Sequence, residues 1–131
     1  MVILYDRFNL PDDVFEIVFA TKQQKVVAKL LINEIKKKKG EFDKPTMSDF
    51  ATKLHDGSMV TEIDDPEFKG KKVRVSYNKR QFYDRILTPM KGMGIVDYDL
   101  YKKTYHLSEK FNDDMVNIGS LWIKEIAKHP V

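Results

Sequence analysis

The chain has 131 residues, of which 42% are hydrophobic and 33% are charged, with a formal net charge of +3 and no cysteine. This length suits one domain, residues 1–131, with its own buried core, and the composition argues against disorder and against a membrane span. The absence of cysteine excludes disulfides, thiol catalysis and thiolate metal sites, and the start of the chain lacks the basic region of a secretory signal. We therefore expect a cytoplasmic protein.

The charges are clustered along the chain. Residues 21–40 hold seven lysines against Glu34, and residues 69–85 hold seven basic side chains against Asp84, whereas residues 61–67 are acidic. A lysine run at a helix end, such as residues 36–39, is typical of a solvated face that also complements the helix dipole. The basic segment over residues 69–85 is less easily explained as a solvated helix end.

Five helices and a hairpin are predicted in chain order, and the first three helices lie in the first half of the chain. Pro11 and the acids after it indicate a short leading helix. A helix over 21–39 follows from apolar residues at spacings of three and four, with Gly40 as its stop, and a second runs from a Thr46 cap to about Gly57. The buried faces of these two helices should consist of Val27, Leu30, Leu31 and Ile35 in the first and Met47, Phe50, Ala51 and Leu54 in the second.

The second half of the chain mixes strand and helix patterns. Residues 58–70 suggest a loop or an extended excursion, and residues 71–77 alternate as a half-buried strand does. A helix over 79–91 has the apolar stripe Tyr83, Ile86, Leu87 and Met90, with Pro89 expected to weaken its last turn. Runs at 95–98 and 103–107 predict a hairpin, and a last helix should span about 108–128. The fold class predicted is α+β, mainly α.

Two helices, a third basic helix and a hairpin follow the order of a winged helix-turn-helix. The stretch "FATKQQKVVAKLLINEIKKKKGEF" resembles the first helix of such domains, "TMSDFATKL" the second, "NKRQFYDRILTPMKGMGIV" the recognition helix and "TYHLSEKF" the returning wing strand. Over about 19–111 the chain resembles the superfamily of MarR-type and PadR-type transcription regulators, with extra helices at both ends. As a small, lysine-rich chain without cysteine, it is similar to small regulators of archaea and their viruses. The connection 55–78 is longer than is usual between the second and third helices.

This arrangement predicts sequence-specific binding to double-stranded DNA by a transcription regulator, associated with the nucleoid when bound. The helix over 79–91 would enter the major groove, where Arg80, Gln81 and Arg85 suit base edges. Asp84 shares this face and would oppose DNA unless it pairs with an arginine. The wing over 95–107 would hold phosphates. The predicted DNA-binding residues are Lys79, Arg80, Gln81, Asp84, Arg85, Thr88, Lys71, Lys72, Lys102 and Lys103.

Other functions are less well supported by the sequence. The three histidines are dispersed, and the paired aspartates lie at positions where helix starts and turns commonly have acidic residues. The sequence contains no phosphate-binding motif and no motif of a catalytic nucleophile. We therefore expect no catalytic residues, no metal and no cofactor. The main alternative is a winged-helix module that binds another protein in a transcription or replication complex.

Apolar residues near both chain ends predict a homodimer. Phe111, Met115, Ile118, Trp122 and Ile126 follow helical spacing, Leu121 and Ile123 widen their face, and residues 14–19 are also apolar. The alternative is that the two terminal helices pack on each other and complete a monomeric core. The residues predicted at the dimer interface are Phe15, Val18, Phe19, Met115, Ile118, Trp122 and Ile126.

Overall fold

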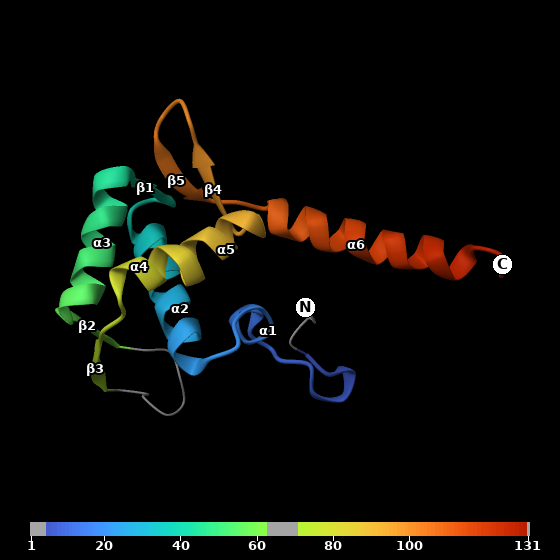
Figure 1. Ribbon diagram of the computed structural model, residues 1–131, viewed down its shortest axis with the longest axis horizontal. Coiled ribbons are helices and arrows are strands. Elements are labelled where there is room, and N and C mark those ends of the chain that lie inside the picture. The colour runs from blue at the N-terminus through green and yellow to red at the C-terminus, as the bar shows by residue number, and fades with distance from the viewer. Residues whose placement is uncertain (1–4, 63–70, 131) are drawn as a thin grey trace.

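In the computed structural model, which describes residues 5–62 and 71–130, helices α2 (Lys22–Lys37) and α3 (Lys44–Asp56) contribute much of the buried core (Figure 1). The Thr21 hydroxyl accepts a hydrogen bond from the Gln24 amide (3.1 Å) and caps α2. At the other end the Gly40 amide donates to the Ile35 carbonyl (2.8 Å), with a φ of 84° that favours glycine. The predicted helix over 21–39 and its buried face are confirmed.

Helix α3 begins earlier than the sequence predicted. Its N-cap is Asp43, whose carboxylate accepts the Thr46 amide (2.8 Å), so the prediction of a Thr46 cap is wrong. Pro45 in the first turn needs no hydrogen-bond partner, which lets the helix start on the residue before it. The helix ends at Gly57 as expected, and all four residues predicted for its apolar face are buried.

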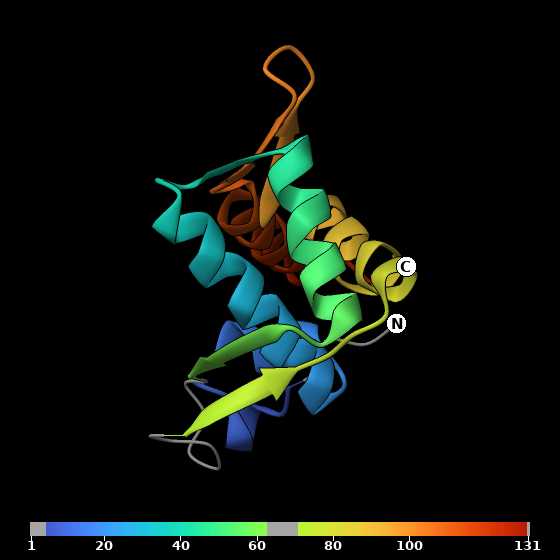
Figure 2. The same ribbon diagram turned by 90° about the vertical axis from the view of Figure 1, so that its left-hand side faces the viewer.

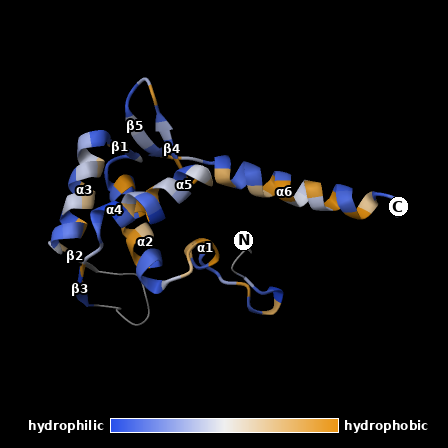
Figure 3. Cartoon of the chain, viewed as in Figure 1, coloured by the Kyte–Doolittle hydropathy of each residue, from blue (hydrophilic) through white to orange (hydrophobic). Residues whose placement is uncertain are grey.

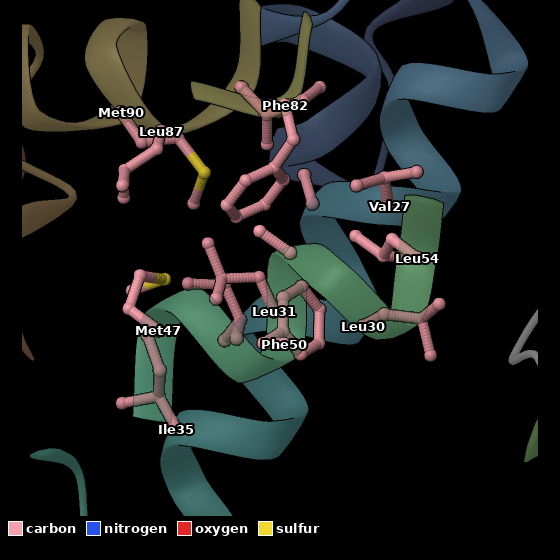
Figure 4. Close-up of a cluster of buried hydrophobic side chains, with 14 of the residues drawn as sticks. Val27, Leu30, Leu31, Ile35, Met47, Phe50, Leu54, Phe82, Leu87 and Met90 are labelled. Carbon is pink, nitrogen blue, oxygen red and sulfur yellow. The ribbon is translucent and has the colours of Figure 1, made fainter. Parts of the chain in front are cut away.

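The predicted helix over 79–91 is a composite of three pieces. Helix α4 (Lys79–Gln81), a π-helical turn (Phe82–Leu87) and helix α5 (Thr88–Gly92) run without interruption, and we call them together the 79–92 helix. Its buried side chains meet those of α2 and α3 in one cluster (Figure 4). Three helices thus share one core, and the cluster shown includes Val27, Leu31, Phe50, Leu54, Phe82 and Met90.

Two small antiparallel sheets flank these helices. Strands β1 (Glu41–Asp43), β5 (Thr104–Leu107) and β4 (Val96–Asp99) pair in that order, and β4 with β5 forms the predicted hairpin. Strand β1 was not predicted, because three residues carry too little alternation to be recognised. Strands β2 (Met59–Glu62) and β3 (Lys72–Val75) pair separately, so the long connection between α3 and the 79–92 helix contains a hairpin. This hairpin and the β4–β5 hairpin lie at opposite ends of α3 (Figure 2).

The chain extends beyond this core at both ends. A 3-10 turn (Arg7–Asn9) and helix α1 (Val14–Val18) follow one another near the start, and α6 (Lys110–Ala127) projects as an isolated rod (Figure 1). Helix α1 is held to α2 by an ion pair between Asp13 and Lys29. The structure therefore describes an α+β fold that is mainly helical.

The two terminal helices do not complete a shared core. Phe19 is buried inside the monomer, and Phe15 and Val18 are half-buried against its core, so these three predicted interface residues are largely used within one chain. By contrast, every residue from Asn112 to the end of α6 is exposed. The four interface residues predicted on α6 are thus left without partners in the described part of the chain.

Candidate nucleic-acid interface

The 79–92 helix has one buried side and one polar side. Phe82, Ile86, Leu87 and Met90 are buried, while the side chains that share the opposite face are exposed. The structure thus brings together five of the predicted DNA-binding residues and adds one that was not predicted. The exposed face consists of Arg80, Gln81, Asp84, Arg85, Thr88 and Lys91.

A π-helical turn sets which side chains reach the core. The Thr88 amide donates to the Tyr83 carbonyl, five residues back, and the next residue, Pro89, has no amide hydrogen and would crowd the Arg85 carbonyl in a regular helix. The irregularity therefore precedes the proline, and the last turn continues to Gly92. The expected weakening of that last turn by Pro89 stays a prediction.

Phe82 replaces Tyr83 as the main aromatic contact of this helix with the core. Its side chain is fully buried, with its ring 5.5 Å from the ring of Phe50, whereas Tyr83 is only half-buried. The predicted apolar stripe began at Tyr83, and its omission of Phe82 was wrong. Tyr83 stands three and four residues before Ile86 and Leu87, as a regular helix requires, whereas Phe82 stands four and five residues before them, a spacing that fits the wider π-helical turn.

The charges on the exposed face are only weakly paired. Arg80 Nε lies 3.8 Å from Asp84 Oδ2, with side chains 91% and 67% exposed, and an ion pair that exposed contributes at most about 1 kcal/mol. Arg85 forms no ion pair with the residues that the structure describes. Both guanidinium groups are therefore available to a ligand, and the Asp84 charge is partly offset by Arg80.

Lys79 lies between helices rather than on the exposed face. Its ammonium group donates to Thr52 Oγ1 (3.0 Å) and Ser48 Oγ (3.4 Å) on α3, and its backbone amide donates to His55 Nδ1 (3.1 Å). The sequence predicted Lys79 as one of the DNA-binding residues. The structure instead shows a side chain that joins α3 to the start of the 79–92 helix.

The loop of the β4–β5 hairpin presents both apolar and basic side chains. Asp99 Oδ1 accepts the amides of Lys102 (3.1 Å) and Tyr101 (2.9 Å), and these hydrogen bonds hold the pKa of its carboxyl below the ordinary value. Lys103 closes the loop with a φ of 55°. Lys102 and Lys103 are exposed as predicted, beside Tyr101, which is 99% exposed.

Two lysines that the sequence did not single out lie between the helix and this hairpin. Lys44 Nζ is 5.4 Å and Lys91 Nζ is 5.8 Å from the centre of the Tyr98 ring, within the range of cation–π attraction. Tyr98 in turn packs on Tyr105 with ring centres 4.7 Å apart. These contacts join segments far apart in sequence, so no local pattern could have indicated them.

Lys71 and Lys72 lie apart from the other predicted residues. They stand at the start of β3, whose other end leads into the 79–92 helix, on the hairpin opposite the β4–β5 hairpin (Figure 2). Both are exposed. The structure does not bring them together with Lys102 and Lys103.

Within residues 5–62 and 71–130, no group of three or more histidine, aspartate or glutamate side chains could hold a metal ion. Over the same residues, each helix is too short or too polar to cross a bilayer. No family model matches the chain, and neither the curated proteins nor the solved structures give a match.

Proposed function

We propose that this chain is a winged-helix protein that binds double-stranded DNA in a sequence-specific manner and regulates transcription. The element order supports this: α2, β1 and α3 are followed by the 79–92 helix and then by the β4–β5 hairpin, which would be the wing. The β2–β3 hairpin is an insertion in this order. The buried face of the 79–92 helix fixes it against α2 and α3, which leaves its polar face free for a ligand.

The major groove of DNA suits this exposed face. The groove is about 12 Å wide and a helix with its side chains is about 10–12 Å across, so the 79–92 helix fits it. Arg80 and Arg85 would donate in pairs to guanine edges, and Gln81 would pair with adenine. Lys79 has a supporting role here, because its bonds to α3 hold the start of the helix in place.

Phosphate contacts would come from the surroundings of the helix. Lys102 and Lys103 extend from the wing loop, and Lys44 and Lys91 lie between the wing and the helix. Backbone phosphates attract such lysines without regard to sequence, whereas the arginines read bases. Lys71 and Lys72 are too distant from this surface to be included in the proposal.

The observation that carries the proposal is the availability of Arg80, Gln81 and Arg85 on one side of a helix whose other side is buried. Exposed arginines on one helix face also fit an acidic partner protein, which is the alternative. The two differ in the partner that this face binds, which is duplex DNA in one case and an acidic protein in the other. Against DNA, the Asp84 carboxylate in the middle of this face repels phosphates, and its removal should strengthen binding.

The test first selects the duplexes that the wild-type protein prefers from a randomised 30-base-pair pool, and then measures fluorescence anisotropy with one labelled selected duplex over a range of salt concentrations. Wild-type affinity should fall steeply with salt, by roughly 0.9 logarithmic units per tenfold change in salt for each phosphate neutralised. Arg85→Ala should weaken binding about tenfold or more, since an arginine at a base edge is worth about 1–3 kcal/mol. Asp84→Asn should tighten binding.

A matched control is Lys37→Ala, which removes one positive charge from α2, behind the 79–92 helix in Figure 1. It should bind the duplex as the wild-type protein does. Equal losses for Lys37→Ala and Arg85→Ala would mean that only net charge matters and would reject the helix assignment. Binding that is flat in salt, or absent, would favour the protein-binding alternative.

A further inference from the structure

Helix α6 carries apolar side chains that nothing in the described chain covers. Trp122, at its centre, is 63% exposed, and the rest of the helix beyond Phe111 is exposed as well. Figure 3 shows hydrophobic positions recurring along the rod. The exposed apolar side chains of α6 are Met115, Val116, Ile118, Leu121, Trp122, Ile123 and Ile126.

Most of these side chains share one broad face. At 100° per residue, they cover an arc of roughly 160°, from Ile118 to Val116, with Leu121 as the exception. A two-stranded coiled coil needs a narrower stripe than this. The face of α6 therefore has room for more than one neighbour.

The amino-terminal arm, residues 5–13, offers a second uncovered apolar surface. Phe8 is 90% exposed, and Tyr5 and Leu10 are also exposed. The arm lies below α6 in both Figure 1 and Figure 2. Between the base of α6 and α1 there is also an apolar pocket of about 400 Å³, with Phe15, Val18 and Phe111 in its lining. The apolar surface is thus continuous from α1 onto α6.

We propose that α6 pairs antiparallel with α6 of a second copy of this chain, and that the amino-terminal arms cover the flanks of the pair. The charges on the helix favour this occupant and this direction. Its first residues, 109–114, carry a net charge of −2, with three acids against Lys110, whereas residues 124–128 carry +1, with two lysines against Glu125. Antiparallel pairing therefore brings ends of opposite net charge together, while parallel pairing would place like charges together.

The available area is sufficient for a stable pair. Burying an apolar side chain removes about 60–120 Å² from water, so the six that share this face contribute on the order of 500 Å² per copy. A standard interface buries about 800 Å² per partner, and the arm supplies the difference. Gly119 lies within the apolar face, and a Cβ added to it would meet no other described side chain within 4 Å, so two helices can approach closely there.

This inference does not depend on DNA binding, because the oligomeric state is measured on the protein alone. In sedimentation equilibrium at about 20 µM the full chain should be a dimer, and Ile118→Glu should raise its dissociation constant at least a hundredfold. Asn117→Glu adds the same charge one residue away on the polar face and should remain a dimer. Phe8→Asp should raise the dissociation constant about tenfold through the arm. A monomeric wild-type protein under these conditions would overturn the proposal and would mean that another protein covers α6. An unchanged dissociation constant for Phe8→Asp would show that the amino-terminal arm does not contribute to the dimer.

The direction of pairing can be tested by cross-linking, because the chain has no native cysteine. Asn112→Cys and Ile126→Cys lie near opposite ends of α6 and about equally far from Gly119. On mild oxidation, a mixture of the two variants should form mainly the mixed disulfide if the helices are antiparallel. Efficient self-linking of each variant alone would show a parallel pair. This readout does not use Ile118→Glu, so it holds even if that variant fails to fold.

Discussion

Replacing Phe82 by alanine should strongly destabilise the protein. The side chain is fully buried, and its ring lies 5.5 Å from the rings of both Phe50 and Tyr83. Truncating a buried phenylalanine to alanine costs about 3–5 kcal/mol, which includes the loss of the aromatic contacts. Since a domain is stable by about 5–15 kcal/mol, Phe82→Ala should lose a large share of its free energy of unfolding.

Urea unfolding, followed by circular dichroism at one protein concentration, measures this loss. With a slope of about 2 kcal/mol per molar urea, the midpoint should move down by roughly 2 M. Phe82→Leu keeps most of the volume and should cost less, and Tyr101→Ala, at a fully exposed site, should change the midpoint little. A loss below about 1 kcal/mol for Phe82→Ala, at unchanged slope, would refute the placement of Phe82 in the core and with it the π-helical turn.

Two further predictions concern the base of α6. Gly94 has a φ of 78°, and a Cβ there would lie 2.9 Å from the Phe111 amide nitrogen. Gly94→Ala should therefore cost at least about 1–2 kcal/mol and lower the melting temperature. Gly92 has open space around it, so Gly92→Ala should leave the melting temperature unchanged. Equal melting temperatures for the two variants would contradict this prediction. The pKa of Asp97 lies below its ordinary 3.8, first because of the hydrogen bond from Lys110. The contribution of the Asp97 carboxylate to stability is thus present above pH 3.8 and is lost as the pH falls through the lowered pKa. The free energy of unfolding should therefore fall less steeply with acid in Asp97→Asn. An identical acid profile for the two proteins would count against the hydrogen bond between Asp97 and Lys110.

The sequence predicted those parts of the fold that depend on local patterns. The helix over 21–39 has a threonine cap, an apolar stripe and a glycine stop within one stretch, and the structure confirms all three. The hairpin over 95–107 was equally predictable from the sequence, because two β-rich runs flank a short loop. Each of these elements owes its form to residues close together in sequence.

The remaining features depend on contacts between distant residues. Strand β1 exists because Phe42 pairs with Tyr105 on β5, and three residues alone have little preference for a strand. The Asp43 cap and the Thr46 cap were both compatible with the sequence, and the proline decided between them. On the candidate interface, periodicity placed Arg80, Gln81 and Arg85 correctly on an exposed face. It could not show that Lys79 bonds to α3 or that Lys44 and Lys91 meet at Tyr98.

The junction between β5 and α6 determines where the rod points. Only Ser108 and Glu109 separate the strand from the helix, and the Ser108 and Phe111 amides are bonded to the Ile95 and Gly94 carbonyls (3.0 and 3.1 Å). Strand and rod are consequently joined without a flexible linker. Each residue added to the start of α6 would rotate the rest of the helix by about 100° and advance it by about 1.5 Å. The number of residues in this junction therefore sets the rotational orientation of the apolar face about the axis of α6. Insertions and deletions change that number, whereas point substitutions do not.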